Sequence, residues 1–251
     1  MISCKLHGGL GNYMFQLAVA NCLAIKHNNY AMFNLEDATL VHKPAKMYEH
    51  NILRKIKTGT PELLYEYNEP CWFKYNKLPY KDGMLLKGYF QSEKYLDRDI
   101  VLDLYEIDEK TKTYIETKYG NDFTNTVSIH IRRNDYLTKP ESYIIQDMDY
   151  YIKAMEHFKH CDKFLIFSDD IEWCRQHFKG SQFEFIQEED YIDLWLMSMC
   201  NHNIIGNSTF SWWGAWLNQH LDKIVIAPKK WFAPAKNANT NDLIPIEWKQ
   251  I

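Results

Sequence analysis

The stretch Val127–Asp135, which reads VSIHIRRND, decides how the second half of this chain folds. Its first residues alternate between apolar and polar types, and this period of two is typical of a β-strand. The alternation places the imidazole of His130 and the guanidinium of Arg132 on one face. The opposite face carries the apolar side chains of Val127, Ile129 and Ile131.

The end of this strand carries a candidate for binding an anion. A guanidinium is permanently charged, and its planar set of donors matches the oxygens of a phosphate group. Arg132 is therefore a candidate for holding a phosphate leaving group. The alternative for this segment is a strand end held by salt bridges.

From Phe123 onward the sequence alternates regularly between short apolar runs and helical patterns. We expect strands at 127–132, 163–167, 183–186, 203–205 and 223–227, and helices at 150–160, 171–178, 192–200 and 209–219. Such alternation predicts an α/β fold with a parallel sheet flanked by helices on both faces. Ligands of these sheets bind beyond the carboxyl ends of the strands. The segments 132–135, 168–170 and 206–208 should meet at that edge.

The first half of the chain has a less regular pattern. It begins with an apolar strand at 2–6, a turn of sequence HGGLGN at His7–Asn12, a helix at about 13–27 and a strand near 30–34. Prolines and aromatic residues interrupt the stretch 36–120. The chain of 251 residues exceeds the size of about 100–150 residues that is commonest for one domain. From length alone, one large domain and two smaller domains are both possible.

Composition restricts the class of protein. Hydrophobic residues make up 46% and charged residues 25%, as in ordinary globular proteins. No apolar run approaches the roughly 20 residues that span a bilayer, and no secretory leader is recognisable, so a soluble, cytoplasmic protein is expected. The net charge of -4 argues against nucleic acid as the main partner. The 6 cysteines form no C-x-x-C pair, and free thiols are expected.

The glycine-rich turn joins a strand to a helix. Backbone amides at such a junction can receive an anion or a sugar, which makes Gly9, Gly11 and Asn12 candidate ligand contacts. A dinucleotide-binding fingerprint would need a third glycine where Met14 stands. A tight turn that requires a positive φ is the alternative explanation.

Polar residues at two other strand ends are also candidates. Asp170 can cap the following helix or accept a hydrogen bond from a ribose or a base. Asp193, near the start of the helix at 192–200, could recognise a base.

Hydroxyls and free amides at a helix start offer donors to a phosphate. At the start of the helix at 209–219 these candidates are Asn207, Ser208, Thr209, Phe210 and Ser211.

Asp147 and Asp149 form a D-x-D sequence before the helix expected at 150–160. Two carboxylates with this spacing can bind Mg²⁺ or Mn²⁺, as in metal-dependent glycosyltransferases. The alternative is that Asp149 caps the helix.

Taken together, these segments resemble the α-1,2-fucosyltransferases of family 11, which share an H-x-R-R-x-D motif with other fucosyltransferases. The matching segments are 7–16 (HGGLGNYMFQ), 130–135 (HIRRND), 168–174 (SDDIEWC) and 193–217 (DLWLMSMCNHNIIGNSTFSWWGAWL). The stretch 36–120 is unmatched, and acceptor preference is expected to lie there.

The resemblance implies a GT-B-like fold of two Rossmann-like halves facing a cleft. Residues 123–251 would bind GDP-fucose, and residues 1–122 would supply the acceptor side and a glycine-rich loop that closes on the donor. The implied reaction is an inverting, metal-independent transfer of L-fucose to the 2-hydroxyl of an oligosaccharide acceptor ending in β-galactose. An α-1,6 or protein O-linked specificity remains open from the short motif alone, whereas the long match at 193–217 favours α-1,2.

The resemblance also implies roles for single residues. Arg132 would bind the β-phosphate, His130 would lie near the ribose, and Asp135 would order the loop. Residues 208–211 would add phosphate contacts, and the carboxylates at 170 and 193 would recognise ribose and guanine. The residues implied to touch the donor from the glycine turn are Gly9, Gly11 and Asn12. The catalytic base stays open between Asp135, Glu141, His7 and no base at all.

Two other functions remain alternatives. One is a metal-dependent D-x-D glycosyltransferase that uses another sugar, and the other is a non-catalytic protein that binds nucleotide sugars or glycans. The sequence also leaves open a peripheral contact with a membrane that carries lipid-linked acceptors, and the oligomeric state.

Overall fold

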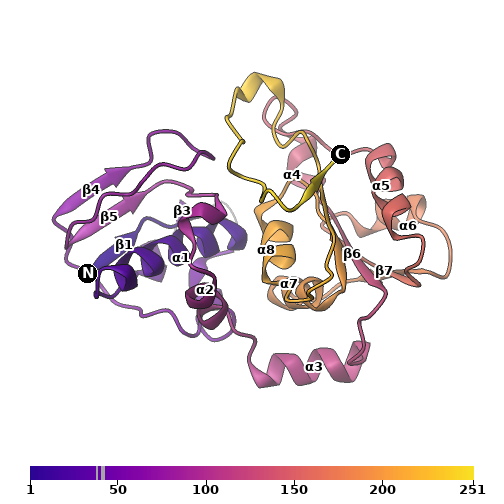
Figure 1. Cartoon of the computed structure of the whole chain (residues 1–251), viewed down its shortest axis with the longest axis horizontal. Helices are drawn as coiled ribbons and strands as arrows, with labels where there is room; N and C mark the ends of the chain where they lie inside the picture. The colour runs from indigo at the N-terminus through magenta and orange to yellow at the C-terminus, as the bar shows by residue number, and fades with distance from the viewer. Residues whose placement is uncertain (38, 41–42) are drawn as a thin grey trace. The chain divides into compact units, whose positions relative to one another are not determined.

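A computed structural model describes residues 1–37, 39–40 and 43–251, and its contacts divide the chain into two compact units (Figure 1). Unit 1 comprises Met1–Asp108 and Asn239–Pro245, and unit 2 comprises Glu109–Ala238 and Ile246–Ile251. Each unit contains a parallel sheet with helices. The α/β class predicted from the sequence is confirmed.

Unit 2 contains a sheet of six parallel strands in the order β11-β10-β9-β6-β7-β8. The strands are β6 (Thr126–Ile131), β7 (Lys163–Ser168), β8 (Phe183–Ile186), β9 (His202–Ile204), β10 (Val225–Ala227) and β11 (Lys249–Gln250). The first strand in the sequence, β6, lies in the middle, and the order reverses between β6 and β9. This is the strand order of a Rossmann fold, whose ligands bind where the order reverses.

Helices cover both faces of this sheet. They are α3 (Glu109–Tyr119), α4 (Asn134–Leu137), α5 (Met148–Met155), α6 (Ile171–His177), α7 (Asp190–Met199) and α8 (Thr209–Leu217), with 3-10 turns η4 (Glu156–Phe158) and η5 (Pro234–Lys236). The strands and helices predicted between 127 and 227 are all present, although the helix predicted at 150–160 is divided into α5 and η4. The sequence pattern does not predict the strand β11.

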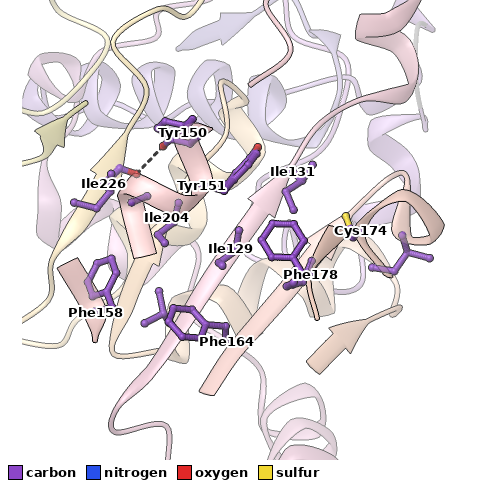
Figure 2. Packing of buried hydrophobic residues seen from close by; sticks show 14 residues of the cluster. Ile129, Ile131, Tyr150, Tyr151, Phe158, Phe164, Cys174, Phe178, Ile204 and Ile226 are labelled. Carbon is purple, nitrogen blue, oxygen red and sulfur yellow. Dashed lines mark hydrogen bonds between the residues drawn. The ribbon is translucent and has the colours of Figure 1, made fainter. Parts of the chain in front are cut away.

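The central strand β6 is buried on both faces. On one face Ile129 and Ile131 pack in a cluster with Tyr150, Tyr151 and Phe178 from α5 and the end of α6 (Figure 2). On the other face Asn203 donates hydrogen bonds to the hydroxyl of Ser128 (2.7 Å) and to the carbonyl of Met197 in α7 (2.8 Å). The predicted alternation is therefore present, but its polar face is covered by helices.

The boundary between the units differs from the predicted one. The resemblance implies a boundary at 122/123, whereas contacts divide the chain after Asp108. The reason is that α3 is attached to unit 2 through Glu188, whose carboxylate accepts hydrogen bonds from Tyr114 (2.9 Å) and Tyr119 (2.6 Å) and pairs with Lys118.

Unit 1 has a smaller parallel sheet in the order β1-β5-β4 and a parallel pair, β2 with β3. Its elements are β1 (Ile2–Cys4), β2 (His7–Gly8), α1 (Leu10–Lys26), η1 (Leu35–Asp37), β3 (Thr39–Leu40), η2 (Ala45–Tyr48), β4 (Tyr65–Asn68), β5 (Met84–Lys87), η3 (Glu93–Tyr95) and α2 (Arg98–Leu104). In place of the strand predicted near 30–34, there are isolated bridges at Ala31 and Phe33.

A segment from the end of the chain completes unit 1. Asp242 accepts a hydrogen bond from the amide of Tyr75 (2.9 Å) and pairs with Lys94. No helix among the described residues is both long and apolar enough to cross a membrane.

Candidate functional site

The candidate site lies in unit 2, where the carboxyl ends of β6 and β9 meet. His130 is the last residue but one of β6 and only 5% exposed, and its ring lies 5.5 Å from that of Phe210 in α8. Burial, and after it the charge of Arg132, lowers the pKa of His130 to about 3. The imidazole is therefore neutral at pH 7, and its buried Nδ1 atom has no hydrogen-bond partner among the residues that the structure describes. A neutral ring with an unused nitrogen can bind a ligand hydroxyl.

Arg132 follows β6 and is held by two carboxylates through one of its nitrogens. Its Nε atom donates to Asp135 (2.8 Å) and lies 3.2 Å from a carboxylate oxygen of Asp169. The two terminal Nη groups donate no hydrogen bond to any of the residues described, and 27% of the side chain is exposed. The salt-bridged strand end and the anion site are thus compatible, because the pairing orients the guanidinium and leaves most of its donors available.

The charge of Arg132 is secured by these neighbours. Burial lowers the pKa of Arg132, but the hydrogen bond that it donates to Asp135 and the charges of Asp169 and Asp135 raise the pKa by more. The guanidinium is therefore a fixed cation at the end of the strand.

Arg133 has a different environment from its neighbour. Its Nε atom donates to Asp170 (3.0 Å), and its guanidinium carbon lies 4.0 Å from the centre of the Trp173 ring. The other oxygen of Asp170 caps α6 by accepting from the amide of Trp173 (3.2 Å). The capping role considered for Asp170 is confirmed, and both of its oxygens are engaged within the protein. Its predicted contact with a ribose stays a prediction.

Asp169 is a site residue to which the sequence analysis gave no role. Its carboxylate accepts from the amides of Arg133 (2.9 Å) and Asn134 (3.3 Å) and faces Arg132. Burial raises the pKa of Asp169, although Arg132 and the two amides act in the opposite direction. The position directly after a buried strand, facing the loop that follows β6, is the signal that could have identified it.

The start of α8 lies on the other side of the place where the strand order reverses. Ser208 caps the helix by accepting from the amide of Phe210 (3.3 Å), and Ser211 donates to the carbonyls of Ser208 (3.2 Å) and Gly206 (3.4 Å). Thr209 and Phe210 form the half-buried first turn. A Cβ atom on Gly206 would lie 3.0 Å from the carbonyl oxygen of His130, so a glycine permits this close approach.

Asn207 is buried and positions loops. Its side-chain amide donates to the carbonyls of Ile144 (2.9 Å) and Trp231 (2.7 Å), and its own carbonyl accepts from Tyr136 (2.7 Å). Asp193 lies in the first turn of α7, where its charge is favourable to the helix dipole. Direct contacts of these two residues with a nucleotide stay predictions.

The glycine turn belongs to unit 1, and its helix begins earlier than predicted. α1 starts at Leu10 with Gly9 as the cap, so Gly11 and Asn12 lie inside the first turn. The positive φ belongs to Gly8 (95°), where a Cβ atom would lie 2.2 Å from the side-chain nitrogen Nδ2 of Asn12. The carboxamide of Asn12 accepts from Gln91 (2.9 Å), which fixes the turn to the loop after β5.

The two carboxylates considered as metal ligands are both exposed. Asp147, rather than Asp149, caps α5 by accepting from the amide of Tyr150 (3.0 Å). Of the described residues, only His160, Cys161 and His202 form a group of three potential metal ligands. His202 accepts the amide of Ile224 at Nδ1, so the neutral ring carries its proton on Nε2, which disfavours a metal there.

The three residues considered as catalytic bases differ in environment. Asp135 is paired with Arg132, and Glu141 is exposed. His7 is half-buried, and burial lowers its pKa more than the carbonyl of Lys5 raises it. His7 is therefore neutral at pH 7 and can accept a proton.

Comparison with known proteins identifies the family. A model of glycosyl transferase family 11 matches residues 1–251. The chain belongs to glycosyl transferase family 11. This glycosyltransferase is 34% identical to the O-antigen biosynthesis glycosyltransferase WbnK of Escherichia coli, over 93% of this chain and 95% of that protein. It is 29% identical to an α-1,2-colitosyltransferase of Escherichia coli, over 100% and 99% of the two chains.

Shorter matches extend to animal enzymes. The galactoside 2-alpha-L-fucosyltransferase SEC1 of Bos taurus is 32% identical over 36% of this chain and 28% of that protein. The family predicted from the sequence is confirmed.

Solved structures agree with the fold. The fucosyltransferase NodZ from Bradyrhizobium superposes with a TM-score of 0.53 and 12% identity, over 85% of this chain and 91% of that one. At this identity the likeness shows the fold alone, which is the GT-B-like fold expected for the family.

Proposed function

We propose that this glycosyltransferase moves L-fucose from GDP-β-L-fucose to the 2-hydroxyl of a terminal β-galactose, with inversion and without a metal. The observation that carries the proposal is that the two Nη groups of Arg132, where the strand order of the Rossmann sheet reverses, donate no hydrogen bond within the described part of the chain. One relative is an α-1,2-colitosyltransferase, which supports the α-1,2 linkage. Another is a galactoside 2-alpha-L-fucosyltransferase, which supports fucose as the transferred sugar and a galactoside as the acceptor.

The reaction separates charge at the glycosidic bond. As the bond between C1 of fucose and the phosphate oxygen breaks, positive charge develops on the sugar and negative charge on the departing diphosphate. The Nη groups of Arg132 and the amides at the start of α8 stabilise that anion in place of a metal. The neutral imidazole of His130 accepts or donates a hydrogen bond at a ribose hydroxyl.

Inversion requires the acceptor oxygen to attack C1 from the face opposite the phosphate. The acceptor hydroxyl forms the new C1–O bond and loses its proton to a base or to water, while the electrons of the broken bond leave with GDP. His7 is a suitable base by its protonation state, and Asp135 is less suitable because it is committed to Arg132.

A colitosyl donor is the second candidate, because the colitosyltransferase relative matches along the full chain. A panel of GDP-sugars, including fucose and colitose donors, should be incubated with β-galactosides, and the new linkage determined by NMR. Transfer of fucose to O2 would support the first proposal. Transfer of colitose alone would show that the donor carries colitose and not fucose. The role proposed for Arg132 would be unchanged.

Chelation tests the metal-dependent alternative. We expect activity to be retained in excess EDTA, because Arg132 and the α8 amides take the role of the ion. The measurement is initial rate before and after chelation, with Mn²⁺ restored as a control. A complete loss of rate that Mn²⁺ reverses would favour a D-x-D mechanism through Asp147 and Asp149.

The cellular location is part of the proposal. The 6 cysteines are all unpaired, and buried free thiols are typical of a reducing cytoplasm. Lipid-linked acceptors would bring the protein into peripheral contact with a membrane surface.

A further inference from the structure

Unit 1 carries a cluster of rings from the strand β2 and from the loops that follow β4 and β5. We name the cluster of His7, Trp72, Phe73 and Tyr89 the aromatic rim. Tyr89 lies at its centre, with ring centroids 4.4 Å from His7, 5.3 Å from Trp72 and 5.7 Å from Phe73. His7 belongs to a segment that resembles the fucosyltransferases. The other three residues of the rim lie in the unmatched stretch 36–120.

Trp72 and Phe73 differ sharply in exposure. Trp72 is 53% exposed, whereas Phe73 is 4% exposed and stacks against Tyr89 with an angle of 21° between the rings. A large indole that is half exposed and is held edge-on by Tyr89 and Phe73 provides a flat surface on which another ring can pack.

A polar group lies beside this surface. The Nδ1 atom of His7 lies 3.1 Å from the side-chain nitrogen of Gln16 and 3.4 Å from the carbonyl of Lys5. Its Nε2 atom has no hydrogen-bond partner among the described residues. The combination of apolar rings and one available polar atom is typical of a small-molecule site.

The backbone of the rim is held in an unusual conformation. Phe73 and Phe90 have φ values of 66° and 52°, which bulky residues rarely adopt. Glu69, 6% exposed, accepts from the amides of Tyr89 (2.7 Å) and Phe90 (3.1 Å) through the same oxygen. A Cβ atom on Gly88 would lie 2.4 Å from the Cβ atom of Glu69, so this approach requires glycine. Strained positions of this kind cluster at functional sites.

We infer that the aromatic rim binds the terminal sugar of the acceptor, with the exposed face of Trp72 stacked on the apolar face of a pyranose. His7 hydrogen-bonds a sugar hydroxyl through Nε2, and Glu69 positions Tyr89 by binding its amide. The inference rests on the proposed function for the identity of the sugar as a β-galactoside.

Trp72→Ala tests the stacking surface. We expect the acceptor KM to rise about tenfold, because loss of one stacked aromatic ring weakens binding about tenfold. The affinity for GDP should be unchanged. Trp72→Phe should recover most of the affinity. Tyr65→Ala is the matched control, because Tyr65 is a 40% exposed aromatic residue at the opposite end of β4. It should leave the acceptor KM unchanged.

Direct binding separates this inference from the proposed function. Saturation-transfer NMR with methyl β-galactoside, lactose and methyl α-glucoside requires no donor and no turnover. Signals that are present with the wild type and lost in Trp72→Ala support the rim whatever the donor proves to be. Absence of binding by all three sugars, or signals that Trp72→Ala leaves unchanged, would overturn the inference. A failure of GDP-fucose transfer would overturn only the proposed reaction.

The role of Glu69 predicts a dependence on pH. Burial raises the pKa of Glu69 to about 7, against the opposing effect of the two amides. Below that pH the carboxyl is protonated and accepts more weakly from the amides of Tyr89 and Phe90, so the acceptor KM should rise as pH falls from 8 to 6. The groups that face Glu69 are Cys4, Tyr67, Tyr89 and Tyr95.

None of these neighbours is expected to titrate in that range, because burial raises the pKa of each. Glu69→Gln should remove the dependence on pH and leave the acceptor KM high throughout. An unchanged pH profile in a folded Glu69→Gln variant would exclude the positioning role.

Discussion

Replacing Arg132 with alanine should lower the turnover of the transferase about 10²–10³-fold, because the loss of one preorganised donor to a developing anion costs about 3 kcal/mol. The side chain is partly exposed, and alanine removes the cation without opening a deep cavity. The fold should therefore survive. The measurement is kcat with saturating donor and acceptor, accompanied by a thermal unfolding curve.

Two further variants make this result specific. Arg132→Lys keeps the charge but loses the planar set of donors, and we expect intermediate activity. Arg175→Ala removes a surface arginine whose side chain is 45% exposed on α6, and it should leave kcat unchanged. A folded Arg132→Ala variant that retained more than about a tenth of wild-type turnover would refute the role of Arg132.

Asp169→Asn should reduce transfer about 10–100-fold, the size of effect produced when a catalytic group moves by about 1 Å. Asparagine places an NH₂ group where a carboxylate oxygen now faces amide donors and Arg132. Two donors then oppose each other, and the loop after β6 must shift. The initial rate and the affinity for GDP should both decline, with a loss of stability of about 1–3 kcal/mol.

The control for Asp169 is Asp149→Asn. Asp149 is an exposed aspartate in the first turn of α5, and its replacement should change neither rate nor GDP affinity. Equal losses in the two variants would mean that Asp169 has no special part in holding Arg132.

The fold of unit 2 was predictable because its strands and helices carry strong apolar patterns. β8 and the loops at the carboxyl edge lie where the sequence placed them. The small strand β11 was not predictable, because both of its residues are polar and exposed, and only pairing with β10 makes it a strand.

The candidate site was predictable in its location and less so in its partners. The motif identified Arg132 and His130, since strand periodicity and the loop position both depend on local sequence. Asp169 and Asp170 are adjacent and chemically alike, so the sequence could not assign one to Arg132 and the other to Arg133. That choice depends on which way each side chain leaves the end of β7.

The return of Asn239–Pro245 to unit 1 determines how this protein can be dissected. A single cut after Asp108 would leave the first fragment without Asp242, the partner of Tyr75 and Lys94. Removing the tail from residue 239 onward would also take away β11 and the outer edge of the larger sheet. Neither unit corresponds to one uninterrupted piece of the gene product, so fragments should be studied by co-expression or by joining the distant segments with a linker.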